Sequence, residues 1–399
     1  MDKPERSLVP AWRSAHWAAG HVRDWRRSFE DTFPIDAWDP LARLIRSLHW
    51  DWVQVWFVAF LIYGPIEKLL LPALGGYLTL TGDLHTWRPD IEALLTGFVE
   101  FPFFFAFYVW SSHGISDLFV SLAQNNSFRD GERYHSFYEQ VSRSFDRWWW
   151  TALSFGLALI AVALMHWVMW RPDAPLPPWF GSERVYPRVV SLFLIFWVAY
   201  AVAQVVIREL LAGFWLRRLW RDIGDDLVVH PYHADGAGGL GAIGRHVVNL
   251  SYFILMIMLF IVMGSLLPSL RTPGQLSPSL WSPLLALVWM LYFTFVPAIF
   301  YLLIWTPHCT MRQVRIERLN TIGAQLEAQL DAAEANAKGD QADLSERLKK
   351  LQDLKGVQTL LQEDLPTWPL NRRLWRRLSL SSLLPVLSTV LTLVLEFLT

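Results

Sequence analysis

Long runs of apolar residues constrain this 399-residue chain more than any other feature of its sequence. A helix needs about 20 apolar residues to cross a bilayer. Seven stretches approach or reach that length: residues 53–74, 94–118, 148–170, 188–212, 247–267, 282–305 and 379–398. Hydrophobic residues make up 53% of the chain and charged residues only 18%, which argues against two or three soluble domains. We therefore predict an all-α, polytopic membrane protein with about seven transmembrane helices.

The lysines and arginines predict the orientation of these spans, because basic residues concentrate on the cytosolic side. With a cytosolic N-terminus, only six of the 35 basic residues lie on the outer side: Lys68, Arg88, Arg171, Arg184, Arg188 and Arg271. An odd number of spans then places the C-terminus outside. We expect an integral protein of a bacterial inner membrane, with the lipid bilayer as its first partner.

The chain divides into four segments around these spans. Residues 1–50 form an N-terminal cytosolic segment, in which a basic amphipathic helix at 15–29 lies on the membrane surface or packs on the protein's own cytosolic part. Residues 51–310 hold six spans and their cytosolic loops, and residues 311–370 form a cytosolic helical hairpin. Residues 371–399 hold a basic flank and the final span.

Helical stripes of apolar residues extend several spans into the cytosol. Before the third span, a stripe from Tyr134 to Trp148 predicts one continuous helix over about 132–170. Two further stripes follow the sixth span: Ile316, Leu319, Leu326, Leu330 and Ala333, then Leu344, Leu348, Leu351, Leu354, Val357 and Leu361. Two amphipathic helices with a short polar break between them predict a hairpin of coiled-coil character. Its stripes are buried on each other, on the extended spans or on a neighbouring subunit.

The stretch HPYHADGAGGLG, residues 230–241, resembles a nucleotide-binding motif. Gly236, Gly238 and Gly241 satisfy G-x-G-x-x-G, but a membrane span follows where a dinucleotide fold needs a βαβ unit. No Lys-Ser or Lys-Thr follows the glycines, which excludes a Walker loop. The local interpretation is a turn in which Asp235 caps the fifth span and the glycines take positive φ.

Two ligand hypotheses remain for the same stretch. The amides of Gly236, Gly238, Gly239 and Gly241 before a helix form a concavity suited to an anion such as phosphate. His230, His233 and Asp235 are candidate ligands of a zinc-like metal, which His246, His308 and Cys309 could complete. The spacing H-x-x-H-x-D matches no established zinc pattern, so we predict no cofactor.

Polar residues form one stripe on the final span. Ser382, Pro385, Thr389, Thr392 and Glu396 recur at spacings of three and four on an otherwise apolar helix. Serine and threonine at such positions pack helices closely and hydrogen-bond across them. The alternative is that Ser382, Thr389, Thr392 and Glu396 line a pore, with Glu396 forming an acidic ring that favours cations.

Further charged residues lie within the predicted spans. Glu67 and Glu100 are costly in lipid and are expected to face a cavity or a partner, in a functional or a packing role. Arg208 and Glu209 lie near the cytosolic end of the fourth span. We interpret them as interfacial anchors whose charged ends reach water.

The architecture resembles that of the insect olfactory and gustatory receptors, a family of ligand-gated cation channels. The shared features are seven spans with a cytosolic N-terminus, cytosolic helix extensions and a polar-striped last helix. The resemblance implies that residues 379–398 line the pore of a tetramer and that 311–365 belong to a cytosolic anchor joining the subunits. The HPYHADGAGGLG stretch also resembles one in uncharacterised bacterial polytopic membrane proteins, which implies no function.

The sequence therefore predicts an oligomeric, cation-permeable, channel-like protein, most simply a homo-oligomer, whose last helix lines the pore. The alternative is a membrane-embedded sensor or scaffold that binds an anionic or metal ligand at residues 230–241. No Ser/His/Asp-type set predicts an enzyme, and no feature predicts nucleic-acid binding.

Overall fold

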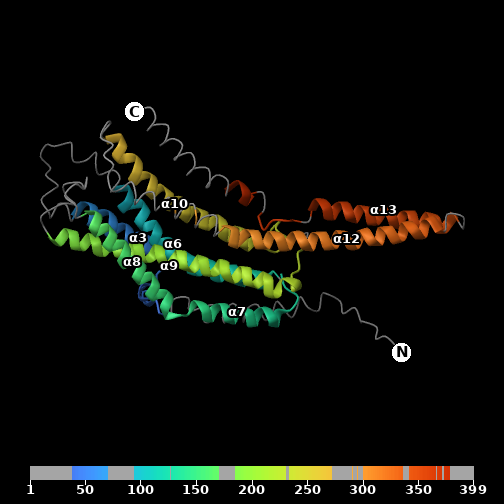
Figure 1. Ribbon diagram of the computed structural model, residues 1–399, viewed down its shortest axis with the longest axis horizontal. Helices are drawn as coiled ribbons and strands as arrows, with labels where there is room; N and C mark the ends of the chain where they lie inside the picture. Colours follow the sequence, from blue (N-terminus) through green and yellow to red (C-terminus); the bar gives the residue numbers. More distant parts are fainter. Residues whose placement is uncertain are drawn as a thin grey trace.

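The computed structural model describes residues 38–70, 94–125, 127–169, 185–230, 233–271, 290, 294, 300–335, 341–364, 366–370 and 373–377. Within them the protein is all-helical, as predicted, and β geometry is confined to an isolated bridge between Phe128 and Leu227. In chain order (Figure 1) the elements are α2 (Pro40–Ser47), α3 (Trp52–Leu61), η1 (Ile62–Leu70), η2 (Thr96–Glu100), α6 (Phe101–Gln124), α7 (Gly131–Phe145), α8 (Trp148–Met169), α9 (Val185–Ile223), η3 (Gly224–Asp226), α10 (Gly241–Arg271), η4 (Tyr301–Trp305), α12 (Thr306–Ala335) and α13 (Gln341–Asp364). The elements η1, η2 and η4 are π-helical.

Four of the described helical segments are long and apolar enough to cross a membrane: Trp52–Leu70, Trp148–Trp167, Val189–Asp226 and Gly241–Leu259. They fit an integral membrane protein and correspond to the first, third, fourth and fifth predicted spans. The second predicted span, which covers η2 and α6, is not one of the four. Most of the sixth predicted span and all of the seventh lie outside the described residues, as does the predicted amphipathic helix at 15–29. The number seven therefore stays a prediction.

The third predicted span does not continue the helix before it, so the prediction of one helix over 132–170 is wrong. Helix α7 ends at Phe145, and α8 begins at Trp148 after a turn at Asp146. The two helices have different surroundings. Helix α7 is amphipathic and buries one face, whereas α8 is apolar throughout and exposes many of its leucines. In Figure 1, α7 runs along α9, and α8 leaves at an angle to α7. A single straight helix could not place the one buried face of α7 and the apolar surface of α8 in these two different surroundings.

Side-chain caps fix where several helices begin. The carboxylate of Asp51 accepts hydrogen bonds from the Val53 and Gln54 amides while Gln54 bonds back to the Asp51 amide, a capping box that starts α3. Asp130 caps α7 through the amides of Glu132 and Arg133. These side-chain bonds satisfy amides that have no partner within the helix.

The core lies where α6, α9 and α10 pack together. The rings of Phe107 and Phe253 stack with their centroids 4.7 Å apart, and Phe104 meets Phe253 edge-on at 5.9 Å. Helix α3 also packs against α6. Aromatic side chains of this size bury large apolar areas and dominate the packing of such a core.

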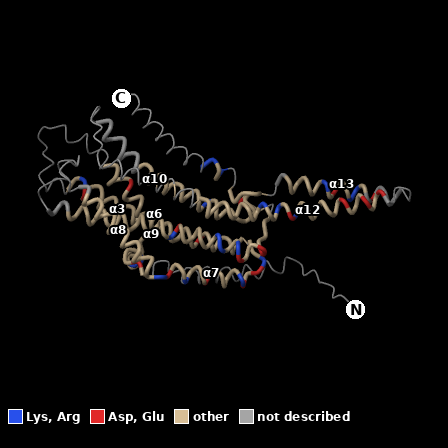
Figure 2. The backbone as a smooth tube through the Cα atoms, in the orientation of Figure 1, with Lys and Arg blue, Asp and Glu red and all other residues tan. Residues whose placement is uncertain are grey.

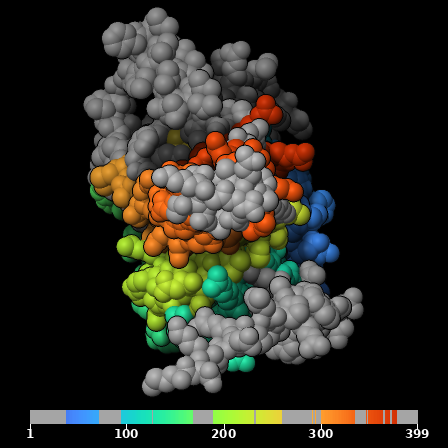
Figure 3. All heavy atoms as spheres, turned by 90° about the vertical axis from the view of Figure 1, so that its right-hand side faces the viewer, coloured from blue at the N-terminus to red at the C-terminus, as the bar shows by residue number. Residues whose placement is uncertain are grey.

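Helices α12 and α13 lie antiparallel and form the predicted hairpin, which extends away from the bundle (Figure 1). The Arg315 side chain donates to the carbonyl of Gln362 and ties the two helices together. Seen from the hairpin end, the two helices occupy the centre of the molecule's face (Figure 3). Several apolar side chains of the hairpin remain exposed: Ile316, Leu330, Leu348, Val357 and Leu360.

Candidate functional site

The four polar residues predicted to line a pore, Ser382, Thr389, Thr392 and Glu396, lie outside the described residues. Their arrangement stays a prediction. The candidate site that the described helices do build consists of charged side chains buried between α2, α6, α9 and α10.

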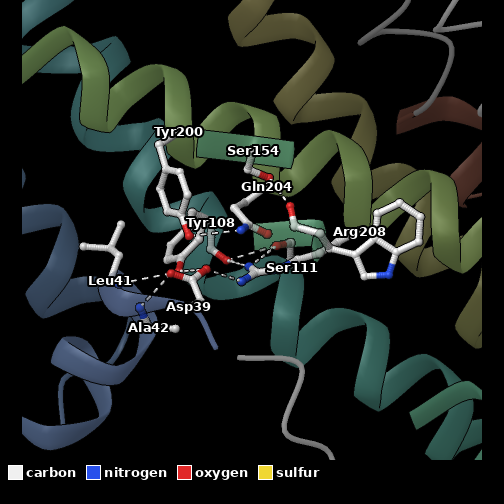
Figure 4. A network of polar contacts seen from close by, with 10 residues as sticks. Asp39, Leu41, Ala42, Tyr108, Ser111, Ser154, Tyr200, Gln204 and Arg208 are labelled. Carbon is white, nitrogen blue, oxygen red and sulfur yellow. Dashed lines mark hydrogen bonds and ion pairs between the residues drawn. The ribbon is translucent and has the colours of Figure 1, made fainter. Parts of the chain in front are cut away.

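An ion pair between Arg208 on α9 and Asp39, which precedes α2, lies at the centre of this site (Figure 4). Arg208 Nη2 lies 3.1 Å from Asp39 Oδ2, and the two side chains are 3% and 2% exposed. Asp39 Oδ1 accepts hydrogen bonds from the amides of Leu41 and Ala42, so Asp39 also caps α2. Each carboxylate oxygen thus has donors of its own, which a buried charge requires.

Residues of α6 and α9 complete the network around the ion pair. The Tyr108 hydroxyl donates to Asp39 Oδ2 at 2.6 Å, and the Tyr108 ring lies 4.6 Å from the Arg208 guanidinium. Arg208 Nη1 donates to the Tyr108 carbonyl at 3.1 Å and to the Ser111 hydroxyl at 3.4 Å. On α9, Gln204 donates to the Tyr200 hydroxyl, which also bonds to Asp39. These charge-assisted hydrogen bonds favour the buried orientation of the Arg208 side chain over one that faces solvent.

The interpretation of Arg208 and Glu209 as interfacial anchors is wrong. The two residues are 2% and 1% exposed, so neither charge reaches water. A chain position near the end of a span does not determine which way a side chain points. Here both point into the protein because each has a buried partner on another segment.

Glu209 pairs with His246 on the second turn of α10. His246 Nε2 lies 2.8 Å from Glu209 Oε2, and the side chains are 2% and 1% exposed. The Trp110 ring of α6 stacks on His246 with centroids 5.5 Å apart. Adjacent residues of α9 therefore bind two different elements: Arg208 binds the segment before α2, and Glu209 binds α10.

The predicted intramembrane acids Glu67 and Glu100 are both buried, at 2% and 1% exposure. Glu67 Oε1 pairs with its neighbour Lys68 at 2.9 Å. The Lys68 side chain lies over Gly97 of η2, where an added Cβ would come within 2.7 Å of Lys68 Cγ. The two charges that interrupt the first span therefore offset each other against η2, which supports the packing role for Glu67. A functional role for either acid stays a prediction.

Residues 233–240 form a tight turn before α10. Gly236, Gly238 and Gly239 have φ of 64°, 69° and 94°, the left-handed region that glycine adopts without strain. The Asp235 carboxylate accepts hydrogen bonds from the amides of Ala237, Gly239 and Gly241. Gly241 is the first residue of α10, so the predicted capping by Asp235 is confirmed.

The amide concavity predicted for an anion thus already holds a carboxylate of the chain. Burial alone raises the pKa of Asp235, but the amides of Ala237, Gly241 and Gly239, together with His233, outweigh burial and lower it. An external anion would have to displace Asp235 from these donors. Anion binding at the loop stays a prediction with that added requirement.

The histidines proposed as metal ligands do not gather at the loop. His233 Nδ1 lies 2.9 Å from Asp235 Oδ1, but His246 is buried against Glu209. His308 on α12 stacks on Trp368 and bonds to the Thr367 carbonyl. Among the described residues, no group of three or more His, Cys, Asp or Glu side chains could hold a metal ion. The proposal that His246 and His308 complete a site with His230 and His233 is therefore wrong.

Sequence reasoning missed Asp39 and Tyr108 as members of the site. One signal pointed to Asp39: an aspartate directly before proline marks a helix start, and Pro40 is the first residue of α2. A buried Arg208 needs an acid to neutralise it, and Asp39 is that acid.

Comparison with known proteins finds no family model, no curated protein and no solved structure that matches the chain.

Substituting Asp39→Asn removes the negative charge and leaves the Arg208 guanidinium buried without a counter-ion. Breaking a buried pair in this way costs about 3–5 kcal/mol. We expect a large drop in the free energy of unfolding of the detergent-purified protein. The matched control is Glu139→Gln, which breaks the exposed Glu139–Arg143 pair of α7 and is expected to cost less than about 1 kcal/mol. Equal effects of the two substitutions would contradict burial of the ion pair.

The lowered pKa of Asp235 predicts a pH-dependent contribution to stability. The ionised carboxylate binds the loop amides, so its contribution is present above the unfolded pKa of about 3.9. That contribution is lost as the pH falls through the lower folded pKa. Asp235→Asn replaces charged hydrogen-bond acceptors by a neutral amide and is expected to destabilise the protein by about 1 kcal/mol at pH 7.

The measurement is the difference in unfolding free energy between the wild type and Asp235→Asn at several pH values. The difference is expected to shrink as the pH falls below about 4. Asp353→Asn, which alters an exposed acid on α13, is the control and is expected to show a small difference throughout. A difference for Asp235→Asn that is constant or grows toward low pH would contradict the assignment.

Proposed function

We propose that the protein is an oligomeric, cation-permeable, channel-like protein of a bacterial inner membrane. It has seven spans, a cytosolic N-terminus and an external C-terminus. Ser382, Thr389, Thr392 and Glu396 of the last span line the ion path, Glu396 attracts cations at its outer mouth, and the apolar residues of the same helix form the gate.

The hairpin of α12 and α13 is the observation that carries the oligomeric part of this proposal. It projects from the bundle and leaves Ile316, Leu330, Leu348, Val357 and Leu360 exposed. Each hairpin helix must bury its apolar stripe, and the facing helix covers only part of it. A second copy of the chain offers the same apolar residues at matching heights, as closed symmetric assemblies require.

The buried charges support an ion path outside the described bundle. Arg208 is neutralised by Asp39, and Glu209 is paired with His246, so these charged groups are committed to holding helices together. The side chains around them pack tightly, with Tyr108 and Leu118 each 1% exposed. A conducting path therefore fits better on the polar stripe of the last span, at an axis shared by several subunits.

Purified protein reconstituted into planar bilayers is expected to carry a cation current. Replacing Glu396 with Gln removes the charge of the proposed acidic ring while keeping its size, so we expect the ratio of cation to anion permeability to fall several-fold. The measurement is the reversal potential in a salt gradient.

The matched control is Glu363→Gln, which removes one acid from the end of α13, 33 positions before Glu396. Its selectivity is expected to equal that of the wild type. Absence of current in the wild type, or unchanged selectivity in Glu396→Gln, would contradict the pore assignment.

A membrane-embedded sensor or scaffold is the second candidate function, and one contact favours it. Gly238 of the loop lies against Pro366, and Gly244 of α10 lies against Pro369 and Leu370, just after the hairpin. A ligand that displaced Asp235 would thus act on the connection between the hairpin and the last span. The same bilayer recordings separate the two functions, because a sensor of this kind carries no current.

A further inference from the structure

The segment between the hairpin and the last span, residues 366–370 and 373–377 in the structure, is hereafter the strap. One face of the strap is fixed to the bundle. Leu370 and Leu374 are buried at 5% and 9% exposure. At Gly244 of α10, an added Cβ would lie 3.0 Å from Leu370 and 3.1 Å from Leu374. The strap therefore fits a notch that only glycine leaves open.

Helix α12 holds the same strap from another side. The His308 ring stacks on Trp368 with centroids 3.8 Å apart and planes 20° from parallel. His308 Nδ1 lies 2.7 Å from the Thr367 carbonyl, and because a carbonyl only accepts, the ring donates from Nδ1. The strap is thus attached to α10 and α12 together.

The other face of the strap is basic and aromatic. Arg373, Arg376 and Arg377 are exposed, and no acidic residue in the described part of the chain forms an ion pair with them. Arg372 adds a fourth arginine within six positions of the sequence. Trp375 is 39% exposed beside these arginines, and Trp305 is 47% exposed near His308. Figure 2 shows the basic residues on the short segment that follows α13.

This combination matches the chemistry of a phospholipid surface. Planar guanidinium groups bind phosphate oxygens in pairs, and tryptophan prefers the boundary between headgroups and acyl chains. Arginine clusters directly beside a span bind anionic lipid at the cytosolic leaflet, and the predicted last span begins at residue 379. The buried leucines turn the arginines away from the protein.

We propose that the strap is a docking surface for anionic phospholipid headgroups of the leaflet that the last span enters. Because the strap is fixed to Gly244 and His308, headgroup binding also stabilises the attachment of the hairpin to the bundle. The proposal goes beyond ion conduction and does not depend on it.

The test uses full-length protein in neutral detergent with added phosphatidylglycerol, phosphatidylcholine or inorganic phosphate. The readouts are the shift in Tm and the apparent Kd for each additive. We expect phosphatidylglycerol to raise Tm and the other two to leave it unchanged. Arg373→Gln, Arg376→Gln and Arg377→Gln together are expected to weaken phosphatidylglycerol binding about 100-fold, from the contribution of each cation near a lipid surface. High salt is expected to reduce the shift in the wild type by screening.

The matched control removes three cations from exposed positions of α13, by Lys349→Gln, Lys350→Gln and Lys355→Gln, and is expected to bind like the wild type. If the arginine variant does not fold, the triple Arg→Lys variant and the wild-type salt titration still test the proposal. An equal Tm shift with phosphatidylcholine, or equal binding by the arginine variant, would overturn it. An equal shift with phosphate alone would replace the lipid with a free anion and would also overturn it.

Discussion

A charged group buried between membrane helices must find an opposite charge, and the described fold depends on one such pair. Arg208 of α9 has its counter-ion in Asp39, which precedes α2, 169 positions earlier in the chain. The guanidinium also bonds to α6 through Tyr108 and Ser111. Three segments must therefore meet at one point. If Asp39 did not reach Arg208, the guanidinium would be an uncompensated charge in a low-dielectric interior, at a cost of several kcal/mol.

The next residue of α9 extends the same principle to a fourth segment. Glu209 binds His246 of α10, and Trp110 of α6 covers the imidazole ring. The capped turn at residues 235–241 sets where α10 begins, which fixes the height of His246 relative to Glu209. Strap residues then pack against Gly244, two residues before His246 on α10. The buried charges, the glycine turn and the hairpin connection thus form one continuous contact path through the bundle toward the hairpin.

Local features could be predicted from the sequence, and long-range ones could not. The helical class, four of the spans, the hairpin and the capping by Asp235 all follow from periodicity or from residues a few positions apart. The direction of the Arg208 side chain depends on an aspartate far away in the chain. The position of Arg208 near the end of a span therefore wrongly indicated an interfacial anchor. The break at Asp146 was missed because the apolar stripe continues across it, while the surroundings of α7 and α8 differ. The sequence order brings His246 and His308 near the loop, but it does not show that His246 pairs with buried Glu209 or that His308 stacks on Trp368.

The central functional claim is that several copies of the last span surround a common axis. Cys309 is the only cysteine of the chain, so a Cys309→Ser background allows single cysteines to be introduced and oxidised in native membranes. Thr389 lies on the polar stripe, and Leu391 lies about 200° around the same helix. The account predicts disulfide-linked dimers for Thr389→Cys and little cross-linking for Leu391→Cys. Cross-linking at Leu391→Cys alone, or at neither position, would contradict a pore lined by this helix.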